Sequence, residues 1–199
     1  MRVLLITLLI LSGQFIHAQD SMFDICPIKV GEDLPAATVV DENDKEVTLS
    51  EIAAEKPTVL IFYRGAWCGY CIQHLSELND IKAEVEALGF QMLGITLDQS
   101  SKLEESSTKS ESEIPVYSDA TAAATKAFGL DWQVGEELFT KYKNEYKLDL
   151  EEWSGQVHHT LPVPAIFVVR DGKIEFQYVN PNYRLRLKPE TLLAVLKTL

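Results

Sequence analysis

The spacing of apolar residues predicts a strand, a helix and a second strand over positions 57–97. Residues 57–63 form an unbroken apolar run, which is typical of a strand buried on both faces of a sheet. Residues 90–97 repeat this pattern after Gly89, where we expect the helix to end. The helix is indicated by apolar residues at three- and four-residue steps: Ile72, Leu75, Leu78, Ile81, Val85 and Leu88. This order of elements forms a parallel crossover unit.

Turn and cap signals divide the rest of the chain. Asp171-Gly172 is a strong hairpin signal between strands over 165–169 and 174–178. The predicted fold is α/β, with a central mixed sheet, helices on both faces, an N-terminal hairpin extension and a helical insertion. Before the crossover unit, we expect a hairpin of strands 37–40 and 46–49 about the polar turn 41–45, and then a helix over 51–55 capped by Ser50. After the unit, we expect a solvated helix and loop over 100–113, a strand over 116–118 and a helix over 120–128 capped by Asp119. An irregular stretch follows over 130–160, with a helix around 136–146, and a last helix runs over 190–199 after Pro189.

Residues 1–18 read as a secretory signal peptide, which leaves one folded domain over residues 19–199. Arg2 precedes an apolar run over 3–11, and Ala18 is the small residue before the expected cleavage site. The run is shorter than the roughly 20 residues of an ordinary membrane span, so we expect no span in the mature chain. The signal predicts an exported protein, periplasmic or secreted.

Charge narrows the range of partners. The chain has 18 Lys and Arg against 30 Asp and Glu, a formal net charge of −12. Nucleic acids and anionic membrane surfaces attract basic proteins, so this balance argues against both as partners.

Two cysteines, Cys68 and Cys71, stand three residues apart at the expected start of the central helix. The unpaired N–H groups and the positive dipole end of a helix stabilise a thiolate there. A free-thiol pKa of about 8.5 falls to roughly 3.5–7.5 in such settings. We therefore expect Cys68, nearer the helix start, to be the nucleophile and Cys71 to resolve the mixed disulfide.

The spacing of this cysteine pair also occurs in structural zinc sites and in structural disulfides. A structural zinc site needs about four ligands, but there is no second cysteine pair, and Cys26 lies far upstream. A structural disulfide at this spacing would close a very small loop and constrain little of the unfolded chain. Thiol redox chemistry, with no metal and no cofactor, is the favoured interpretation. Cys26 itself is expected to be a spare thiol.

Several separated motifs resemble known redox proteins, and the likeness covers roughly residues 28–199. Residues 62–71 resemble the Phe-x-x-x-Trp-Cys-x-x-Cys segment of thioredoxin-like proteins. Residues 114–119, followed by 127–129, resemble the alkyl hydroperoxide reductase/thiol-specific antioxidant (peroxiredoxin) group. Residues 161–169, 171–172 and 179–183 resemble the bacterial peroxiredoxin-like redoxins. The resemblance implies a thioredoxin-like fold and an antioxidant, thiol redox role.

The resemblance also implies roles for residues around the cysteines. Pro164 stands where thioredoxin-fold proteins place a cis-proline, and a cis bond before proline costs only about 0.5–1 kcal/mol. Val163 would then keep a free edge to hydrogen-bond an extended substrate. Trp67 is expected to pack over the rim of the site.

The sequence departs from true peroxiredoxins in two places. Their pattern resembles Thr-x-x-Cys, but Gly65 stands three residues before Cys68. They also supply an arginine from the strand near Phe167, where this chain carries Pro164; Arg64 is a candidate substitute that would stabilise the thiolate. We therefore expect thiol–disulfide exchange as the main activity, with thiol peroxidase as the alternative. The expected partners are protein or small-molecule disulfides and thiols, hydroperoxides under the alternative, and an unidentified electron donor.

His158 and His159 raise a lesser alternative, a copper metallochaperone. Copper chaperones of the thioredoxin fold use two cysteines and a loop histidine, and soft thiolates with imidazole suit copper. Those proteins usually have three residues between their cysteines, whereas this chain has two. A binding module without redox activity would need a damaged pair, and this pair is intact.

Overall fold

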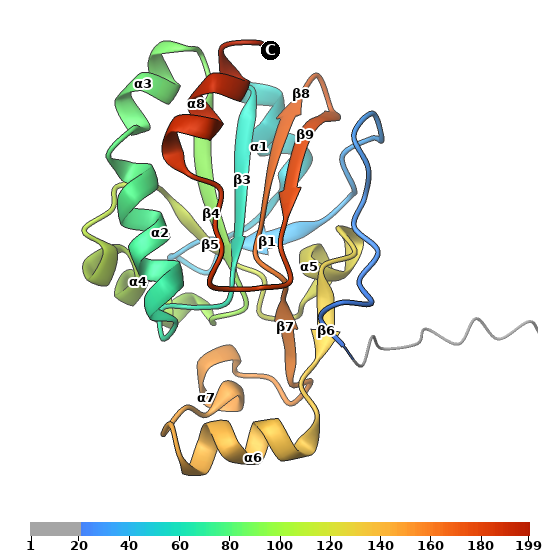
Figure 1. The fold of residues 1–199 in the computed structure, drawn as a ribbon, viewed down its shortest axis with the longest axis vertical. Helices are drawn as coiled ribbons and strands as arrows, with labels where there is room; N and C mark the ends of the chain where they lie inside the picture. Colours follow the sequence, from blue (N-terminus) through green and yellow to red (C-terminus); the bar gives the residue numbers. More distant parts are fainter. Residues whose placement is uncertain (1–20) are drawn as a thin grey trace, which may run out of the picture.

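A seven-stranded mixed sheet forms the centre of the computed structural model, which describes residues 21–199 (Figure 1). Its strands are β1 (Thr38–Val40), β2 (Glu46–Thr48), β3 (Thr58–Tyr63), β4 (Gln91–Thr96), β5 (Val116–Ser118), β8 (Ala165–Arg170) and β9 (Lys173–Val179). They lie in the order β2-β1-β5-β4-β3-β8-β9. β3 is parallel to β4 and antiparallel to β8, which confirms the predicted mixed sheet. The β1–β2 hairpin extends the sheet beyond β5, as predicted.

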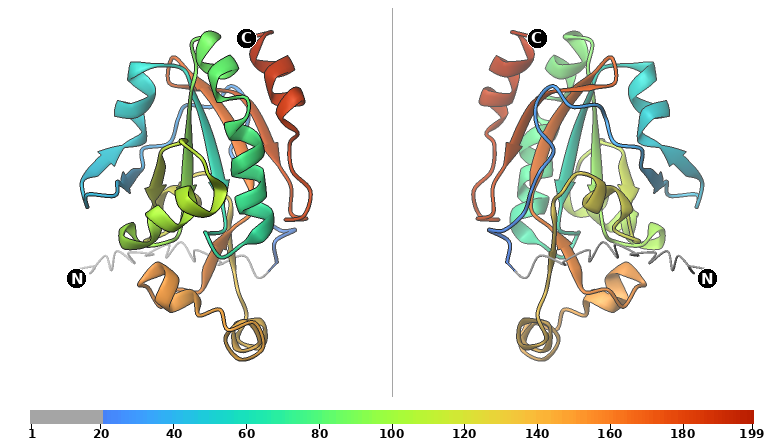
Figure 2. Two further views of the ribbon diagram at one scale, coloured as in Figure 1. Left: turned by 90° about the vertical axis from the view of Figure 1, so that its left-hand side faces the viewer. Right: turned by 90° about the vertical axis from the view of Figure 1, so that its right-hand side faces the viewer.

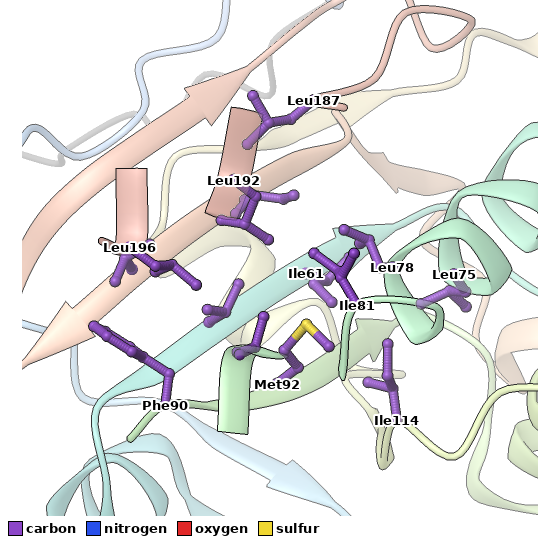
Figure 3. Packing of buried hydrophobic residues seen from close by; sticks show 14 of the residues in the cluster. Ile61, Leu75, Leu78, Ile81, Phe90, Met92, Ile114, Leu187, Leu192 and Leu196 are labelled. Atoms are coloured by element: carbon purple, nitrogen blue, oxygen red, sulfur yellow. The ribbon is translucent and has the colours of Figure 1, made fainter. Parts of the chain in front are cut away.

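Helices cover both faces of this sheet (Figure 2). They are α1 (Leu49–Glu55), α2 (Gly69–Asn79), α3 (Lys82–Ala87), α4 (Leu103–Ser110), α5 (Ala123–Ala127) and α8 (Pro189–Leu196), with a 3₁₀ turn over Ser100–Lys102. Side chains of β3 alternate between the two faces. Ile61 packs in the cluster that α2, α3 and α8 complete (Figure 3), whereas Phe62 packs in the cluster under α1 and α5.

The helical insertion forms a small unit of its own beyond the end of the sheet where β3 finishes (Figure 1). It contains β6 (Asp131–Gln133), α6 (Glu136–Asn144), α7 (Leu150–Ser154) and β7 (Thr160–Pro162), and β6 pairs with β7. The α6 helix was predicted; the β6–β7 ladder and α7 were not. The buried residues of its core are Trp132, Val134, Leu150, Leu161 and Val163. Trp67 packs against this core, so the insertion adjoins the cysteine loop.

The predicted boundaries differ from the structure at several places, among them the cap of α1, the end of α2 and the start of α5. Thr48, not Ser50, caps α1, because Thr48 and Glu51 form a reciprocal capping box. The helix predicted to run to Leu88 is broken between α2 and α3. Asn79 there turns its side-chain oxygen to the Glu113 N–H at 2.9 Å, a tertiary contact. The Asp119 carboxylate does accept amides of α5, but from Ala124 and Thr125, so that helix begins later than predicted.

A short segment before β1, here called the strap (residues 31–34), runs along the outer edge of the sheet. The Gly31 N–H donates to the Ile174 carbonyl at 2.8 Å, and the Ile174 N–H donates to the Glu32 carbonyl at 3.0 Å. The Leu34 N–H donates to the Gly172 carbonyl at 2.8 Å. The strap therefore pairs with the beginning of β9.

The predicted signal peptide over residues 1–18 lies outside the described residues and stays a prediction. Within residues 21–199, every helix is too short or too polar to cross a membrane.

Candidate active site

Cys68 lies at the N-cap of α2, directly after the loop that leaves β3. Its carbonyl accepts the N–H groups of Cys71 at 2.8 Å and Ile72 at 3.0 Å, so the helix starts at the cysteine. The first amides of a helix have no partner within it, and they place a partial positive charge at this end. Cys68 and Cys71 are joined as a disulfide, with their Cα atoms 5.2 Å apart. Both residues are buried, Cys68 at 5% exposure and Cys71 at 1%.

The conformation of the loop at Gly65 has no room for the threonine that the peroxiredoxin pattern has at this position. The φ of Gly65, +146°, is a conformation that side chains disfavour. A Cβ there would also lie 2.6 Å from Oδ1 of Asp98 and collide with the Trp67 indole. The backbone path of this loop therefore requires glycine.

Asp98 holds the same loop from the end of β4. Its carboxylate accepts the Ala66 N–H at 2.7 Å, and the residue is almost fully buried. Burial raises the pKa of Asp98 to about 7, because desolvation of the charged form outweighs the hydrogen bonds from Ala66 and Thr96. Sequence reasoning missed this acid.

Arg64 is buried beside the cysteine loop rather than exposed. Its guanidinium lies over the rings of Tyr183 at 4.5 Å and Trp67 at 4.8 Å, and donates to the Tyr142 hydroxyl at 2.8 Å. Its Nε has no hydrogen-bond partner in the described part of the chain. Arg64 and Trp67, both predicted as site residues, are thus in contact.

Arg186 is the group that touches a sulfur, and sequence reasoning missed it. Its Nη2 lies 3.3 Å from Sγ of Cys71, 115 positions earlier in the chain, and its Nη1 donates to the Leu185 carbonyl at 3.3 Å. Burial, with the nearby Arg64 charge second, lowers the pKa of Arg186 to about 10, so the group stays charged at neutral pH. The basic run Arg184-Leu185-Arg186 in an acidic chain was the available signal.

His74, one turn after Cys71, anchors the segment that carries Arg186. Its Nε2 donates to the Leu187 carbonyl at 3.0 Å. Burial lowers the pKa of His74 to about 4, so the ring is neutral at physiological pH.

Val163 and Pro164 line one pocket together with Arg64, but their expected backbone roles are wrong. All peptide bonds in residues 21–199 are trans, including the one before Pro164. The trans form is the intrinsically favoured one. The Val163 N–H donates to the Leu130 carbonyl at 2.8 Å, so the insertion already uses the edge predicted to be free. The pocket at this point is lined by Met22, Arg64, Trp132, Tyr142, Pro162, Val163, Pro164, Pro181 and Tyr183.

The two histidines are committed to other partners. His158 accepts the Thr160 N–H at Nδ1 and donates from Nε2 to the Ala120 carbonyl. His159 lies 2.8 Å from a Glu151 oxygen and stacks on a phenylalanine of α6. Residues 21–199 contain no group of three or more His, Cys, Asp or Glu side chains placed to hold a metal. The copper alternative is not supported. Cys26 is exposed and unpaired within the same residues.

Comparison with known proteins identifies the family. The model of the AhpC/TSA family matches residues 30–177. The chain belongs to the AhpC/TSA family. This confirms the resemblance noted from the motifs around the cysteines.

Relatives in the AhpC/TSA family carry peroxiredoxin names. A bcp protein of Haemophilus influenzae is 33% identical over 113 residues, which cover 57% of this chain and 70% of that protein. Peroxiredoxin Bcp of Escherichia coli is 26% identical over 149 residues, covering 75% and 84% respectively. Because these relatives are named peroxiredoxins, this AhpC/TSA chain is an oxidoreductase.

Solved structures confirm the thioredoxin-like peroxiredoxin fold. Reduced Prx3 from Vibrio vulnificus superposes with a TM-score of 0.69 at 19% identity, covering 85% of this chain and 99% of that one. Peroxidoxin BcpB from Mycobacterium tuberculosis gives 0.64 at 19% identity, covering 86% and 97%.

Proposed function

We propose that this protein is a thiol peroxidase in which Cys68 attacks a hydroperoxide and Cys71 resolves the product. The observation that carries the proposal is the position of Cys68 at the start of α2, in a chain whose relatives are named peroxiredoxins. The sequence predicts two activities, thiol–disulfide exchange and thiol peroxidase. We propose the peroxidase, which was the alternative. The loop at Gly65 holds no side chain, so in this proposal the peroxide is positioned without the threonine of the peroxiredoxin pattern.

The oxidative step needs an activated sulfur and a stabilised leaving group. The Cys68 thiolate attacks one oxygen of the hydroperoxide, the O–O bond breaks, and the alkoxide or hydroxide leaves with a proton. Cys68 becomes a sulfenic acid, having given two electrons to the peroxide. The amides at the start of α2 favour the thiolate before the attack and stabilise negative charge during it.

The resolving step forms the disulfide. The Cys71 thiolate attacks the Cys68 sulfur, the S–S bond forms, and the sulfenic oxygen leaves as water after protonation. The overall change converts a hydroperoxide and two thiols into an alcohol, water and a disulfide. A thiol-containing electron donor then returns both cysteines to thiols.

Stopped-flow oxidation of the reduced protein tests this function. Trp67 lies next to Cys68 in the chain, and we expect its fluorescence to follow the reaction. We expect hydrogen peroxide or an organic hydroperoxide to oxidise Cys68 faster than glutathione disulfide does. Cys26→Ser is the matched control, because this thiol stands apart from the pair, and it should react like the unmodified protein.

The second candidate function is thiol–disulfide exchange without peroxide reduction. The Cys-x-x-Cys spacing favours it, because such a pair exchanges readily with other disulfides. If glutathione disulfide oxidises the reduced protein faster than either peroxide, this candidate replaces the peroxidase. Export to an oxidising compartment is also a proposal, and comparison of the N-terminus of secreted and whole-cell protein by mass spectrometry would test it.

A further inference from the structure

Arg186 is a partly buried cation whose one anion-like neighbour is a sulfur. Its two polar contacts are Sγ of Cys71 and the Leu185 carbonyl, both at 3.3 Å. Within residues 21–199 it forms no ion pair, although the chain carries 30 acidic residues. A desolvated guanidinium without an anion is unfavourable. A thiolate on Cys71 would supply the missing negative charge.

The surroundings of Arg186 strengthen this preference for an anion. Arg64, also without an ion pair in the described residues, is close enough to lower the pKa of Arg186. Tyr178, the other group with an electrostatic influence, acts in the opposite direction. His74 is neutral, and its ring donates a hydrogen bond to the carbonyl of Leu187, the residue that follows Arg186. Arg186 thus lies against a sulfur that is neutral in the disulfide and becomes a thiolate on reduction.

We propose that Arg186 is a catalytic residue that makes Cys71 the leaving group when the disulfide is reduced, so that the incoming thiol bonds to Cys68. The proposal deepens the peroxidase proposed above and rests on its cysteine cycle. Both cysteines are buried in the oxidised protein, so the direction of attack is argued from the contact between Arg186 and the Cys71 sulfur.

The step balances as an exchange. The donor's thiolate attacks the Cys68 sulfur, a donor–Cys68 disulfide forms, and the Cys68–Cys71 bond breaks. The electron pair of that bond goes to Cys71, which leaves as a thiolate beside the Arg186 guanidinium. A lower pKa of the leaving thiol accelerates this step. A second donor thiol then releases Cys68 as a thiol and completes the two-electron reduction.

The first test maps the mixed disulfide. The oxidised protein is mixed with one equivalent of 2-nitro-5-thiobenzoate or glutathione, free thiols are quenched by alkylation, and peptides are identified by mass spectrometry. We expect the adduct on Cys68 and the alkyl group on Cys71. Arg186→Met should slow adduct formation by about tenfold, the order expected for loss of a charge-assisted contact. Arg184→Met is the matched control, because this exposed neighbour touches neither sulfur.

The second test measures the stability of the reduced state. Removal of a cation that stabilises the Cys71 thiolate should lower the equilibrium constant for reduction about tenfold, a potential about 30 mV more negative. Arg186→Lys keeps the charge and should recover part of this loss. In a Cys68→Ser background, absorbance at 240 nm should give Cys71 a thiol pKa below the free value of about 8.5, raised by Arg186→Met.

The outcomes separate this proposal from the peroxidase. An adduct on Cys71 in the unmodified protein would overturn the role of Arg186, as would Arg186→Met behaving like Arg184→Met in rate and potential. If Arg186→Met does not fold, the adduct position in the unmodified protein and the Cys71 pKa in Cys68→Ser still decide. Failure to react with peroxide, with the adduct still on Cys68, would remove the peroxidase and leave Arg186 in its role.

Discussion

Cys68 and Cys71 are bonded to each other, yet each meets a different kind of positive charge. Cys68 lies at the start of α2, where the first amides of the helix, provided by its own neighbours in sequence, carry a partial positive charge, although its side chain accepts no hydrogen bond from them. Cys71 faces the full charge of Arg186, which the chain brings in after β9. Amides cannot be titrated or moved without unwinding the helix, whereas a guanidinium sits on a flexible side chain. The environment of Cys68 is therefore fixed by the backbone, and that of Cys71 can be changed by one substitution.

The largest expected effect comes from replacing each sulfur in turn. Cys68→Ser should reduce peroxide turnover by more than about a thousandfold, since the nucleophile is lost. Cys71→Ser should still react once and accumulate a sulfenic acid on Cys68, because only the resolving thiol is missing. Trapping with dimedone followed by mass spectrometry measures this. Comparable peroxide oxidation at Cys71 in the Cys68→Ser protein would reverse the two roles.

Substitution of the glycines on either side of Cys68 should show that the loop before it constrains the stability of the fold more than the first turn of α2 does. Gly65→Ala places a Cβ against Asp98 and forces a residue into positive φ, so it should destabilise the fold by about 2 kcal/mol or more. Gly69→Ala meets nothing within 4 Å and should be neutral or stabilise by up to about 1 kcal/mol. Urea unfolding of both variants gives the comparison. Equal stabilities would mean that the loop relaxes around the new methyl group.

The Asp98 side of the site should show a pH dependence of stability. The pKa of Asp98 is about 7 in the folded protein against about 3.8 for the unperturbed carboxyl, so the folded state binds the extra proton between these values. Stability from this group is therefore lost as the pH rises from about 4 to 7, with a slope of up to about 1.4 kcal/mol per pH unit. Asp98→Asn keeps an acceptor for the Ala66 N–H and should remove this contribution, so the difference in stability between the variant and the unmodified protein should change with this slope. Urea unfolding at several pH values measures it; an unchanged slope would exclude Asp98 as its source.

His74, which lies one turn after Cys71, should give the stability of the fold a pH dependence of the opposite sign to that of Asp98, over a shorter pH range. The pKa of His74 is about 4 when folded against 6.5 unperturbed, so the unfolded state binds the extra proton. Stability from this group is present above pH 6.5 and is lost as the pH falls towards 4. The contributions of His74 and Asp98 have opposite signs and overlap between about pH 4 and 6.5. His74→Gln, which can still donate to the Leu187 carbonyl, should therefore remove the loss of stability towards acid in the same unfolding series and leave the Asp98 slope unopposed. A steeper loss of stability towards acid in that variant would contradict the sign.

Sequence reasoning succeeded where the signal was local. Asp171 and Gly172 both adopt positive φ, 51° and 72°, as the predicted hairpin turn requires. The start of α2 at Cys68 followed from the junction of an apolar strand and an amphipathic helix. The capping error at Ser50 was avoidable, because Thr48 and Glu51 have the spacing of a capping box.

Sequence reasoning failed where contacts join distant parts of the chain. Arg186 reaches Cys71 from 115 positions away, and no local pattern encodes that meeting. Asp98 acquires its raised pKa from burial, which depends on the packing of the complete loop. The predicted free edge at Val163 was wrong because Leu130, in a stretch read as irregular, supplies the partner for its N–H.

The strap has a consequence for how one molecule meets another. A strand at the border of a sheet offers unpaired N–H and C=O groups to any other chain, and β9 is such a strand. The strap occupies the first of these groups through Ile174 and Gly172. The opposite border, β2, is only three residues long and begins with the exposed Glu46, which discourages intermolecular pairing by its shortness and its charge. Loss of the strap's pairing would uncover the first border and turn it into a template for aggregation.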